Sequence, residues 1–476
     1  MKKTIGLILP IVVFIGILMM PLDAFHITGL TVIQQRVIAI FCFAALCWVL
    51  EPIPNFATSV LVIVLELLLI SNKSFFVFQG SGDVFGKPIP FAQIMGTFAN
   101  PIIMLFMGGF FLALAATKYR LDINLARVLI KPFGTKPAMA MLGILMITAV
   151  FSAFMSNTAT AAMMVTLLGP ILSALPDGDR GRAAIALAVP VGANIGGMAT
   201  PIGTPPNAIA LNYVLQIDPT MTFGKWMAFG VPYVLILCVL AWLVLCMLFP
   251  FKAKEFKLTI ESEFLKGWKA NVVYITFAVT VLLWILGGRH GMNAEVVALI
   301  PVGVFVACGI VTKEDVNTQL SWDVLWLVAG GLALGLALDK TGLAKNMVAS
   351  IPFSEFSPFM VLVIASLVTY GCANFMSHTA SANLLLPIIA VMAAGLQGLD
   401  HMGGGLGMII SVTFAASLGM TLPISTPPNA LASATGFVET PDMAKSGIII
   451  GIMGLVLTLI MLFCLSKINF FAAIGA

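Results

Sequence analysis

The sequence predicts an all-α protein that crosses a membrane many times. Of its 476 residues, 60% are hydrophobic and only 9% are charged, with a mean hydropathy of +1.08. Soluble domains carry roughly 25% charged residues, and a water-soluble core of this composition would leave large apolar patches exposed. Apolar runs of about 20 residues, enough for one crossing, recur along the whole chain and predict about 11 transmembrane helices.

The expected spans follow one another with few polar loops between them. They are 4–22, 31–50, 54–71, 93–117, 138–155 with 157–175, 182–200 with 206–217, 227–250, 271–287, 294–311, 316–338, 358–376 with 379–396, 405–422 with 427–436, and 446–466. The first run follows Lys2 and Lys3 and has no small-residue cleavage site after it, which favours a membrane helix over a signal peptide. Residues 118–136 and 251–269 are rich in cations, which places them on the cytoplasmic side of the cell (inner) membrane.

An internal repeat divides the chain. Three segments of the first half recur in the same order in the second half, at offsets of 221 or 222 residues: 108–115 with 330–337, 154–160 with 375–381, and 201–208 with 423–430. The loop after the first glycine pair is cation-rich and its counterpart is not, as expected if the two halves are inverted in the membrane. We therefore expect scaffold helices in 1–90, repeat 1 in 91–250, a cytoplasmic linker with scaffold helices in 251–315, and repeat 2 in 316–476.

Each repeat contains two places where a membrane helix should break. One is the polar cluster Ser156-Asn157-Thr158 or Ser377-His378-Thr379, and the other is the Thr-Pro-Pro-Asn segment within 203–207 or 425–429. An unpaired backbone group costs several kcal/mol in hydrocarbon, so such breaks occur where the freed groups face protein, water or a ligand. Helix N-termini attract anions, while loose carbonyls and hydroxyls suit Na⁺. No lysine or arginine lies in these motifs, which predicts a small anion held by amides, hydroxyls and helix ends.

Further breaks at Asn100-Pro101 and around Leu320-Ser321-Trp322 indicate either hairpins that enter the membrane and turn back, or ordinary kinked spans. The sequence leaves both alternatives open.

Other classes of function fit less well. Small polar residues also pack membrane helices closely, but that does not explain four matched clusters. An anion channel, the main alternative from another class, needs a continuous polar pore lining, which these spans lack. An intramembrane enzyme needs a base beside its nucleophile, and the neighbours Ser377 and His378 seldom present side chains to each other. The histidines and cysteines have no metal-ligand spacing, and there is no basic, aromatic-rich run for nucleic acid, so we expect no cofactor and no nucleic-acid partner.

The paired motifs, together with Glu51-Pro52-Ile53-Pro54, resemble those of the divalent-anion:sodium symporter family, the dicarboxylate and citrate transporters, over essentially the whole chain. The resemblance implies a homodimer in membrane lipid, with a static scaffold, a mobile transport domain, two re-entrant hairpins and elevator-type movement. It implies C4-dicarboxylates such as succinate, malate and fumarate as substrates, with 2-oxoglutarate, citrate or sulfate in some branches.

The resemblance also assigns residues. The substrate would contact Asn157, Thr158, Thr204, Ser377, His378, Thr379, Thr426 and Pro427. A first Na⁺ site would use Ser152, Ser156, Asn157 and Gly203, and a second the positions of Ala373, Met376, His378 and Ser425.

The second half departs from the family pattern. It reads Ser-His-Thr where Ser-Asn-Thr is expected, and the repeat aligns Ser152 with Ala373. An imidazole is a poor Na⁺ ligand beside hard oxygens, and a protonated one is itself a cation. Our hypothesis is that the second site no longer binds Na⁺ and that His378 supplies positive charge to the substrate. This favours dicarboxylate exchange, or coupling to fewer Na⁺ or to H⁺; ordinary Na⁺-coupled symport is the alternative.

Overall fold

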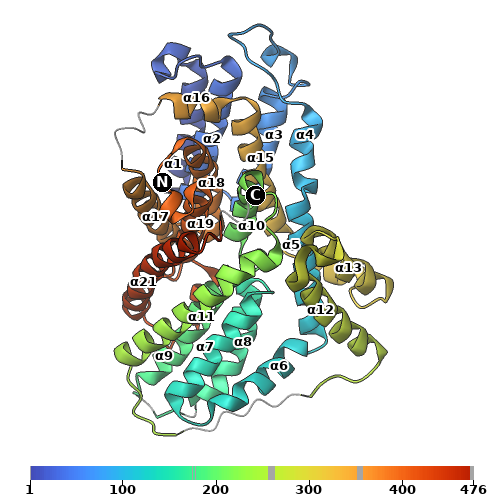
Figure 1. Cartoon of the computed structure of the whole chain (residues 1–476), viewed down its shortest axis with the longest axis vertical. Coiled ribbons are helices and arrows are strands. Elements are labelled where there is room, and N and C mark those ends of the chain that lie inside the picture. The colour runs from blue at the N-terminus through green and yellow to red at the C-terminus, as the bar shows by residue number, and fades with distance from the viewer. Residues whose placement is uncertain (1, 174, 177, 256–262, 351–356, 472–476) are drawn as a thin grey trace.

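The chain folds almost entirely into helices. The computed structural model describes residues 2–173, 175–176, 178–255, 263–350 and 357–471, so 256–262 of the expected linker lie outside the description. Within these ranges the β-structure is one isolated bridge between Ser71 and Ile89. Figure 1 shows helices packed along a long axis, with several that break and restart near the middle.

Most helix bounds match the expected spans to within a few residues. In the first half the α-helices are α1 (Lys2–Met19), α2 (Val32–Leu50), α3 (Asn55–Leu69), α4 (Phe91–Gly96), α5 (Pro101–Lys118), α6 (Leu121–Ile130), α7 (Pro137–Ser152), α8 (Asn157–Ser173), α9 (Gly181–Gly196), α10 (Pro205–Ile217) and α11 (Phe223–Leu248). In the second half they are α12 (Trp268–Leu286), α13 (Ala294–Ala307), α14 (Lys313–Thr318), α15 (Trp322–Lys340), α16 (Leu343–Ser350), α17 (Pro358–Phe375), α18 (His378–Gly395), α19 (Gly404–Ser417), α20 (Pro427–Ala434) and α21 (Thr440–Lys467).

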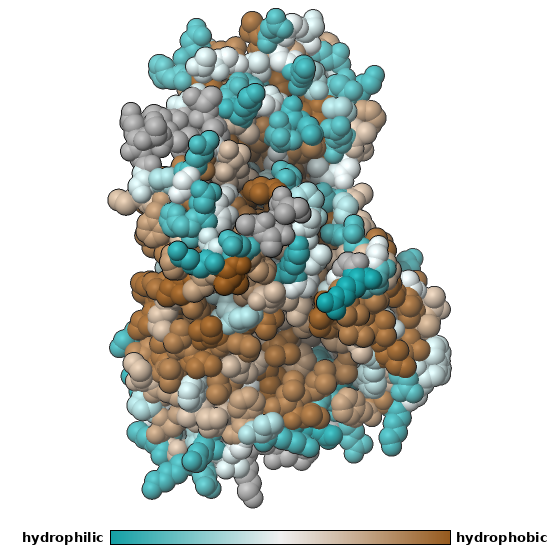
Figure 2. Space-filling view, in the orientation of Figure 1, coloured by the Kyte–Doolittle hydropathy of each residue, from teal (hydrophilic) through white to brown (hydrophobic). Residues whose placement is uncertain are grey.

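The polytopic membrane architecture is confirmed. In the described ranges, nine helical segments are long and apolar enough to cross a bilayer, and several shorter apolar helices accompany them. Figure 2 shows hydrophobic side chains gathered in a band over the lower half of one face, with hydrophilic side chains at both ends of the long axis. Such a band is the surface that lipid chains would cover.

The segment 91–118 is a kinked span and not a hairpin. Asn100 interrupts it with extended backbone, and its side-chain oxygen accepts a hydrogen bond from the Ile102 N–H, which caps α5. The two arms have different neighbours, because α4 packs against α3 whereas α5 packs against α13. They continue in one direction in Figure 1. Proline at the first position of α5 lacks an N–H, which suits a helix that restarts at this point.

Hairpins instead occur at the polar clusters. Helices α7 and α8 are joined by residues 153–156 and pack together, and α17 and α18 are joined by residues 376–377 in the same way. The arms have 16–18 residues, about 24–27 Å at 1.5 Å per residue, which is short of a 30 Å hydrocarbon layer. Figure 1 places the first pair in the lower part of the molecule and the second pair in the upper part.

The second break of each repeat connects the two halves. Helix α9 stops at Gly196 and the chain restarts at Pro205 as α10, while α19 stops at Ser417 and restarts at Pro427 as α20. The restarted helices cross over: α10 packs against α18 and α19 of repeat 2, and α20 packs against α8 and α9 of repeat 1. Each repeat therefore forms part of the surroundings of the other's hairpin.

Candidate functional site

The hairpins and broken helices enclose one cavity of about 480 Å³. The described residues that line it are Pro54, Asn55, Phe56, Phe106, Phe110, Ser156, Asn157, Thr158, Asn194, Ile202, Gly203, Thr204, Pro205, Asp323, Val324, Leu327, Ser377, His378, Thr379, Ser425, Thr426, Pro427 and Pro428. All eight residues expected to contact the substrate are among them. Residues more than 200 positions apart in the chain thus meet at one site, as the repeat predicts.

The tip of the first hairpin is rich in oxygen atoms. The Ser152 hydroxyl donates to the Ala193 carbonyl at 2.7 Å. The side-chain amide of Asn157 lies 2.7 Å from the Ser152 oxygen and, with its nitrogen facing the acceptors, donates to the Gly203 carbonyl at 3.0 Å. Gly197 permits this approach, because a Cβ there would lie 2.6 Å from the side-chain amide of Asn157. Ser152, Asn157 and Gly203 are therefore brought together as expected.

The tip of the second hairpin has different chemistry. Nε2 of His378 lies 2.7 Å from the Gly419 carbonyl oxygen, so this nitrogen carries a proton and donates. The Ser425 hydroxyl donates to the Asn374 carbonyl at 2.8 Å and accepts from the Leu422 N–H. The carbonyl of Gly419 and the hydroxyl of Ser425 are thus already used within the protein.

Two of the expected residues of this second site do not reach the cavity. Ala373 and Met376 are buried and do not line it. Gly419 lies against the backbone of Ala373, because an added Cβ would be 2.4 Å from the Ala373 carbonyl carbon. An alanine at this point leaves room for the loop and contributes no hydroxyl.

Matched asparagines hold the two loops that follow the broken helices. The Asn207 amide donates to the carbonyls of Gly197 and Thr200, and the Asn429 amide donates to those of Met420 and Leu422. These bonds satisfy backbone oxygens that a continuous helix would have paired.

Asn194 connects the two halves at the cavity. Its side-chain nitrogen lies 3.3 Å from the Thr426 hydroxyl and 3.1 Å from the Asn429 amide oxygen, both in repeat 2. Its own oxygen is buried without a hydrogen-bond partner, as is the Thr204 hydroxyl oxygen. Both residues line the cavity and have polar atoms left for a ligand.

Four helices from the paired motifs begin at the cavity, as α3 and α15 also do, and their N-termini provide its positive potential. Helices α8, α10, α18 and α20 start at or next to lining residues. Side chains cap three of them: Ser156 accepts from the Ala159 N–H, Ser377 from the Ala380 N–H and Thr426 from the Asn429 N–H. An anion near such an N-terminus gains about 0.3–2 kcal/mol from each helix. None of the described lining residues is lysine or arginine, and Asp323 adds a negative charge.

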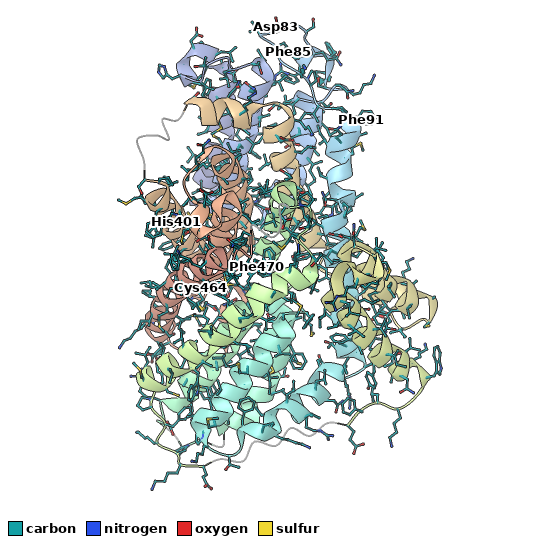
Figure 3. All side chains as sticks on the ribbon, in the orientation of Figure 1. Asp83, Phe85, Phe91, His401, Cys464 and Phe470 are labelled. Carbon is teal, nitrogen blue, oxygen red and sulfur yellow. The ribbon has the colours of Figure 1, made fainter. Side chains whose placement is uncertain are left out.

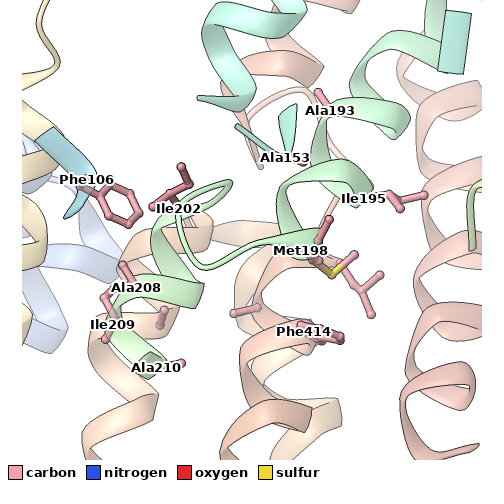
Figure 4. Close-up of a cluster of buried hydrophobic side chains, with 14 of the residues drawn as sticks. Phe106, Ala153, Ala193, Ile195, Met198, Ile202, Ala208, Ile209, Ala210 and Phe414 are labelled. Atoms are coloured by element: carbon pink, nitrogen blue, oxygen red, sulfur yellow. The ribbon is translucent and has the colours of Figure 1, made fainter. Parts of the chain in front are cut away.

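The sequence did not identify several lining residues. Asn55 and Asp323 begin helices outside the motifs, Asn194 lies inside an apolar helix, and Phe106 and Phe110 come from α5. In Figure 4 the ring of Phe106 lies next to Ile202, on the loop that follows the break in α9. Elsewhere among the described residues, no three histidine, cysteine or acidic side chains form a possible metal site.

Comparison with known proteins identifies the family. The family model described as the sodium:sulfate symporter transmembrane region matches residues 1–468. The chain belongs to this family. An uncharacterised transporter of Haemophilus influenzae is 31% identical over 478 residues, which cover 95% of each chain.

Two further family members carry a functional name. The sodium-dependent dicarboxylate transporter SdcS of Staphylococcus saprophyticus is 28% identical over 90% of this chain and 85% of its own, and SdcS of Staphylococcus aureus is 27% identical over 97% and 91%. The expected membership of the divalent-anion:sodium symporter family is thereby confirmed, and the chain is a multi-pass protein of the inner membrane.

Solved structures support the fold alone. The Alcanivorax borkumensis YdaH transporter superposes with a TM-score of 0.58 at 13% identity, covering 88% of this chain and 99% of its own. MtrF of Neisseria gonorrhoeae superposes with a TM-score of 0.51 at 12% identity, covering 87% and 95%.

Proposed function

We propose that this family member is a secondary active transporter of C4-dicarboxylates such as succinate, malate and fumarate across the inner membrane. The main support is the convergence of four helix N-termini and the hydroxyls of Thr158, Thr204, Thr379 and Thr426 on one cavity whose described lining holds no lysine or arginine. Such a cavity suits a small dianion that must be released again, because no fixed ion pair has to break. The names of the staphylococcal relatives point to the same substrate class.

The first hairpin tip supports one Na⁺ site. The Asn157 amide lies within hydrogen-bonding distance of the Ser152 hydroxyl and of the carbonyl oxygens of Ala193 and Gly203. A rotation of the Asn157 amide by half a turn would direct its oxygen toward these atoms, in place of its nitrogen. Na⁺ would then meet hard oxygen ligands. Ser156, the other expected ligand, caps α8 at the same tip.

The second tip supports reduced Na⁺ coupling. Ala373 offers no hydroxyl, and the carbonyl of Gly419 and hydroxyl of Ser425 already have partners. His378 lines the cavity beside Ser377 and Thr379, where a protonated imidazole would meet a carboxylate of the substrate. We therefore favour dicarboxylate exchange, or coupling to one Na⁺ or to H⁺. Ordinary multi-Na⁺ symport and an anion channel are the competing functions.

An elevator movement accounts for access to both sides of the membrane. The hairpins and broken helices pack on one another, whereas α5 and α3 bring residues to the cavity from a separate helix group, so the first set would move past the second. A homodimer of static scaffolds would hold the moving part in lipid.

Uptake of labelled succinate into proteoliposomes tests the proposal. Uptake that needs internal dicarboxylate and little Na⁺ supports exchange. Competition by unlabelled malate, citrate and sulfate shows which anions the site accepts. Strong dependence on a Na⁺ gradient with empty vesicles would overturn exchange in favour of symport. Flux that does not saturate and shows no counterflow would instead favour a channel.

A further inference from the structure

Glu66 is a carboxyl group buried in the membrane region without a partner. It lies on α3, 0% exposed, and neither of its carboxyl oxygens has a hydrogen-bond partner. An ionised carboxylate without partners is very costly in an apolar interior, so buried charges are normally paired. An ionisable residue at membrane depth is a functional candidate for the same reason. Neither the substrate nor the cation sites described above use Glu66.

The position of Glu66 on α3 directs it toward α15. Ser59 is seven residues earlier, two helical turns, and so shares its face of the helix. The Ser59 hydroxyl donates to the Leu327 carbonyl of α15 at 3.3 Å, and a Cβ at Gly330 would lie 2.4 Å from the Ser59 Cβ. We call this contact the α3–α15 seam, formed by Ser59, Glu66, Leu327 and Gly330.

Charged and titratable groups near the seam do not neutralise Glu66. Its packing neighbours are α2, α15 and α4, and α4 carries no such group. The groups on α2 and α15 are Arg36, Cys42, Cys47, Asp323, Asp339 and Lys340. Asp339 and Lys340 are exposed and paired with each other, Asp323 lines the cavity, and Cys42 lines a separate apolar cavity.

Arg36, the cation on α2, binds at the C-terminal end of α3 and in the loop that follows it. Its guanidinium donates to the carbonyls of Leu69 and Phe78, and it lies over the rings of Phe78 and Phe85. Figure 3 places Phe85 at one end of the long axis. Leu69 ends α3, whereas a helical side chain leans toward the N-terminus of its helix, so the carboxyl of Glu66 points away from Arg36.

We propose that Glu66 is a proton-binding site that closes the α3–α15 seam. With its proton, the carboxyl packs as a neutral group. Without its proton, the carboxylate carries an uncompensated charge, which forces α15 away from α3 or draws water into the seam. The seam leads to the cavity, because Asp323, Val324 and Leu327 in the first turns of α15 line it. Proton occupancy of Glu66 would therefore change anion binding, and anion binding would change proton affinity by the same factor.

The first test is on the purified full chain and needs no substrate. Infrared spectra at pH 7 should contain the carbonyl band of a protonated carboxylic acid, and Glu66→Gln should lack it. Thermal unfolding provides the second readout. The native state keeps a proton that the unfolded chain has already released above its ordinary glutamate pKa of about 4.3, so stability should fall as pH rises from 6 to 9. Glu66→Gln should remove this fall, whereas the exposed Glu439→Gln should keep it.

Glu66→Met, an apolar side chain of similar length, serves the same comparison if glutamine is not tolerated. The proposal is overturned if the acid band is absent in wild type or unchanged in Glu66→Gln, or if the unfolding profiles of both proteins coincide.

The coupling to the cavity rests on the proposed function and is tested separately. Apparent affinity for labelled succinate should weaken about fivefold or more between pH 6 and 9 in wild type relative to Glu66→Gln, the lower end of usual couplings between sites. Equal pH profiles would overturn the coupling. If no anion binds to either protein, the proposed function and with it this coupling fail, while the infrared band still decides whether Glu66 holds a proton.

Discussion

The two hairpin tips are equivalent positions of the internal repeat, but they differ in chemistry and in burial. At the first tip Thr158 is exposed and Asn157 is half-buried, whereas at the second Thr379 and His378 are buried. The adjoining loops differ in the opposite sense: Ile202 is 5% exposed beside Phe106, while its counterpart Ile424 is 72% exposed. One loop is thus covered by α5 and the other is open. The repeat thus provides two similar halves whose tips carry different side chains and whose loops differ in exposure.

The largest loss of transport is expected from a substitution at the oxygen-rich tip of the first hairpin. Asn157→Ala removes an amide that contacts Ser152 and Gly203 and takes this hydrogen bond from the Gly203 carbonyl. Hydrogen bonds that involve a charged group contribute about 1.5–3 kcal/mol, so uptake efficiency should fall at least tenfold. Labelled succinate uptake measures it, with Asn124→Ala, which does not line the cavity, as the control. A near-normal rate would remove the first tip from the site.

Making the second tip resemble the first should change the ion requirement. The double variant Ala373→Ser with His378→Asn restores the hydroxyl and amide of Ser152 and Asn157 at the matched positions. The Na⁺ dependence of uptake should become steeper, with a Hill coefficient rising from about one toward two, since two oxygen-rich sites would then bind Na⁺. His378→Asn alone should show part of the change. An unaltered Na⁺ dependence would mean that the two tips do not set the ion count.

A reagent dissolved in water should reach the loop of Ile424 more easily than the matched loop of Ile202. Ile424→Cys should react with a water-soluble thiol reagent about tenfold faster or more than Ile202→Cys, because only the former is exposed. Labelling of the wild-type cysteines sets the background. Equal rates would show that the two loops exchange their environments faster than the reagent reacts.

Removing the charge of Asp323 should increase the affinity for the substrate, and the change should be moderate in size. Its carboxylate lines a cavity that is proposed to bind a dianion, so Asp323→Asn should tighten apparent succinate affinity about threefold to tenfold. The gain should shrink at high ionic strength, because salt screens the repulsion. Weaker binding in this variant would instead assign Asp323 to a cation.

The smallest expected change is in stability, and it concerns an ion pair outside the cavity. Lys118 donates to Asp315 at 2.5 Å, and this hydrogen bond lowers the pKa of the Asp315 carboxyl to about 2. A lowered pKa adds stability at neutral pH that is lost as pH falls below about 4 toward 2. Because Lys118 is partly exposed, Asp315→Asn should cost only about 1 kcal/mol at pH 7. Thermal unfolding at pH 7 and pH 3 measures the difference, which should be smaller at pH 3 because this pH lies within the range over which the stabilisation is lost.

The motifs predicted which of their own residues meet at the cavity, but they did not predict the residues that surround those motifs. Thr-Pro-Pro-Asn and the serine clusters break helices for local reasons, so their consequences are visible in the sequence. Asn194 and Glu66 lie within regular helices and have no polar counterpart in the repeat, so only tertiary packing shows their surroundings. The hairpin positions had a usable signal, since Ser156 and Ser377 each divide a long apolar run into two arms of 16–18 residues, near the lower limit for crossing a bilayer.

The crossover of α10 and α20 bears on the origin of the protein. Because α20 packs on α8 and α9 while α10 packs on α18 and α19, neither half contains a complete pocket. A primitive single-copy gene product would have had to associate as two identical subunits of opposite orientation before any pocket existed. Within one chain the two copies can differ from each other, as they do where His378 takes the place that Asn157 has in the first half.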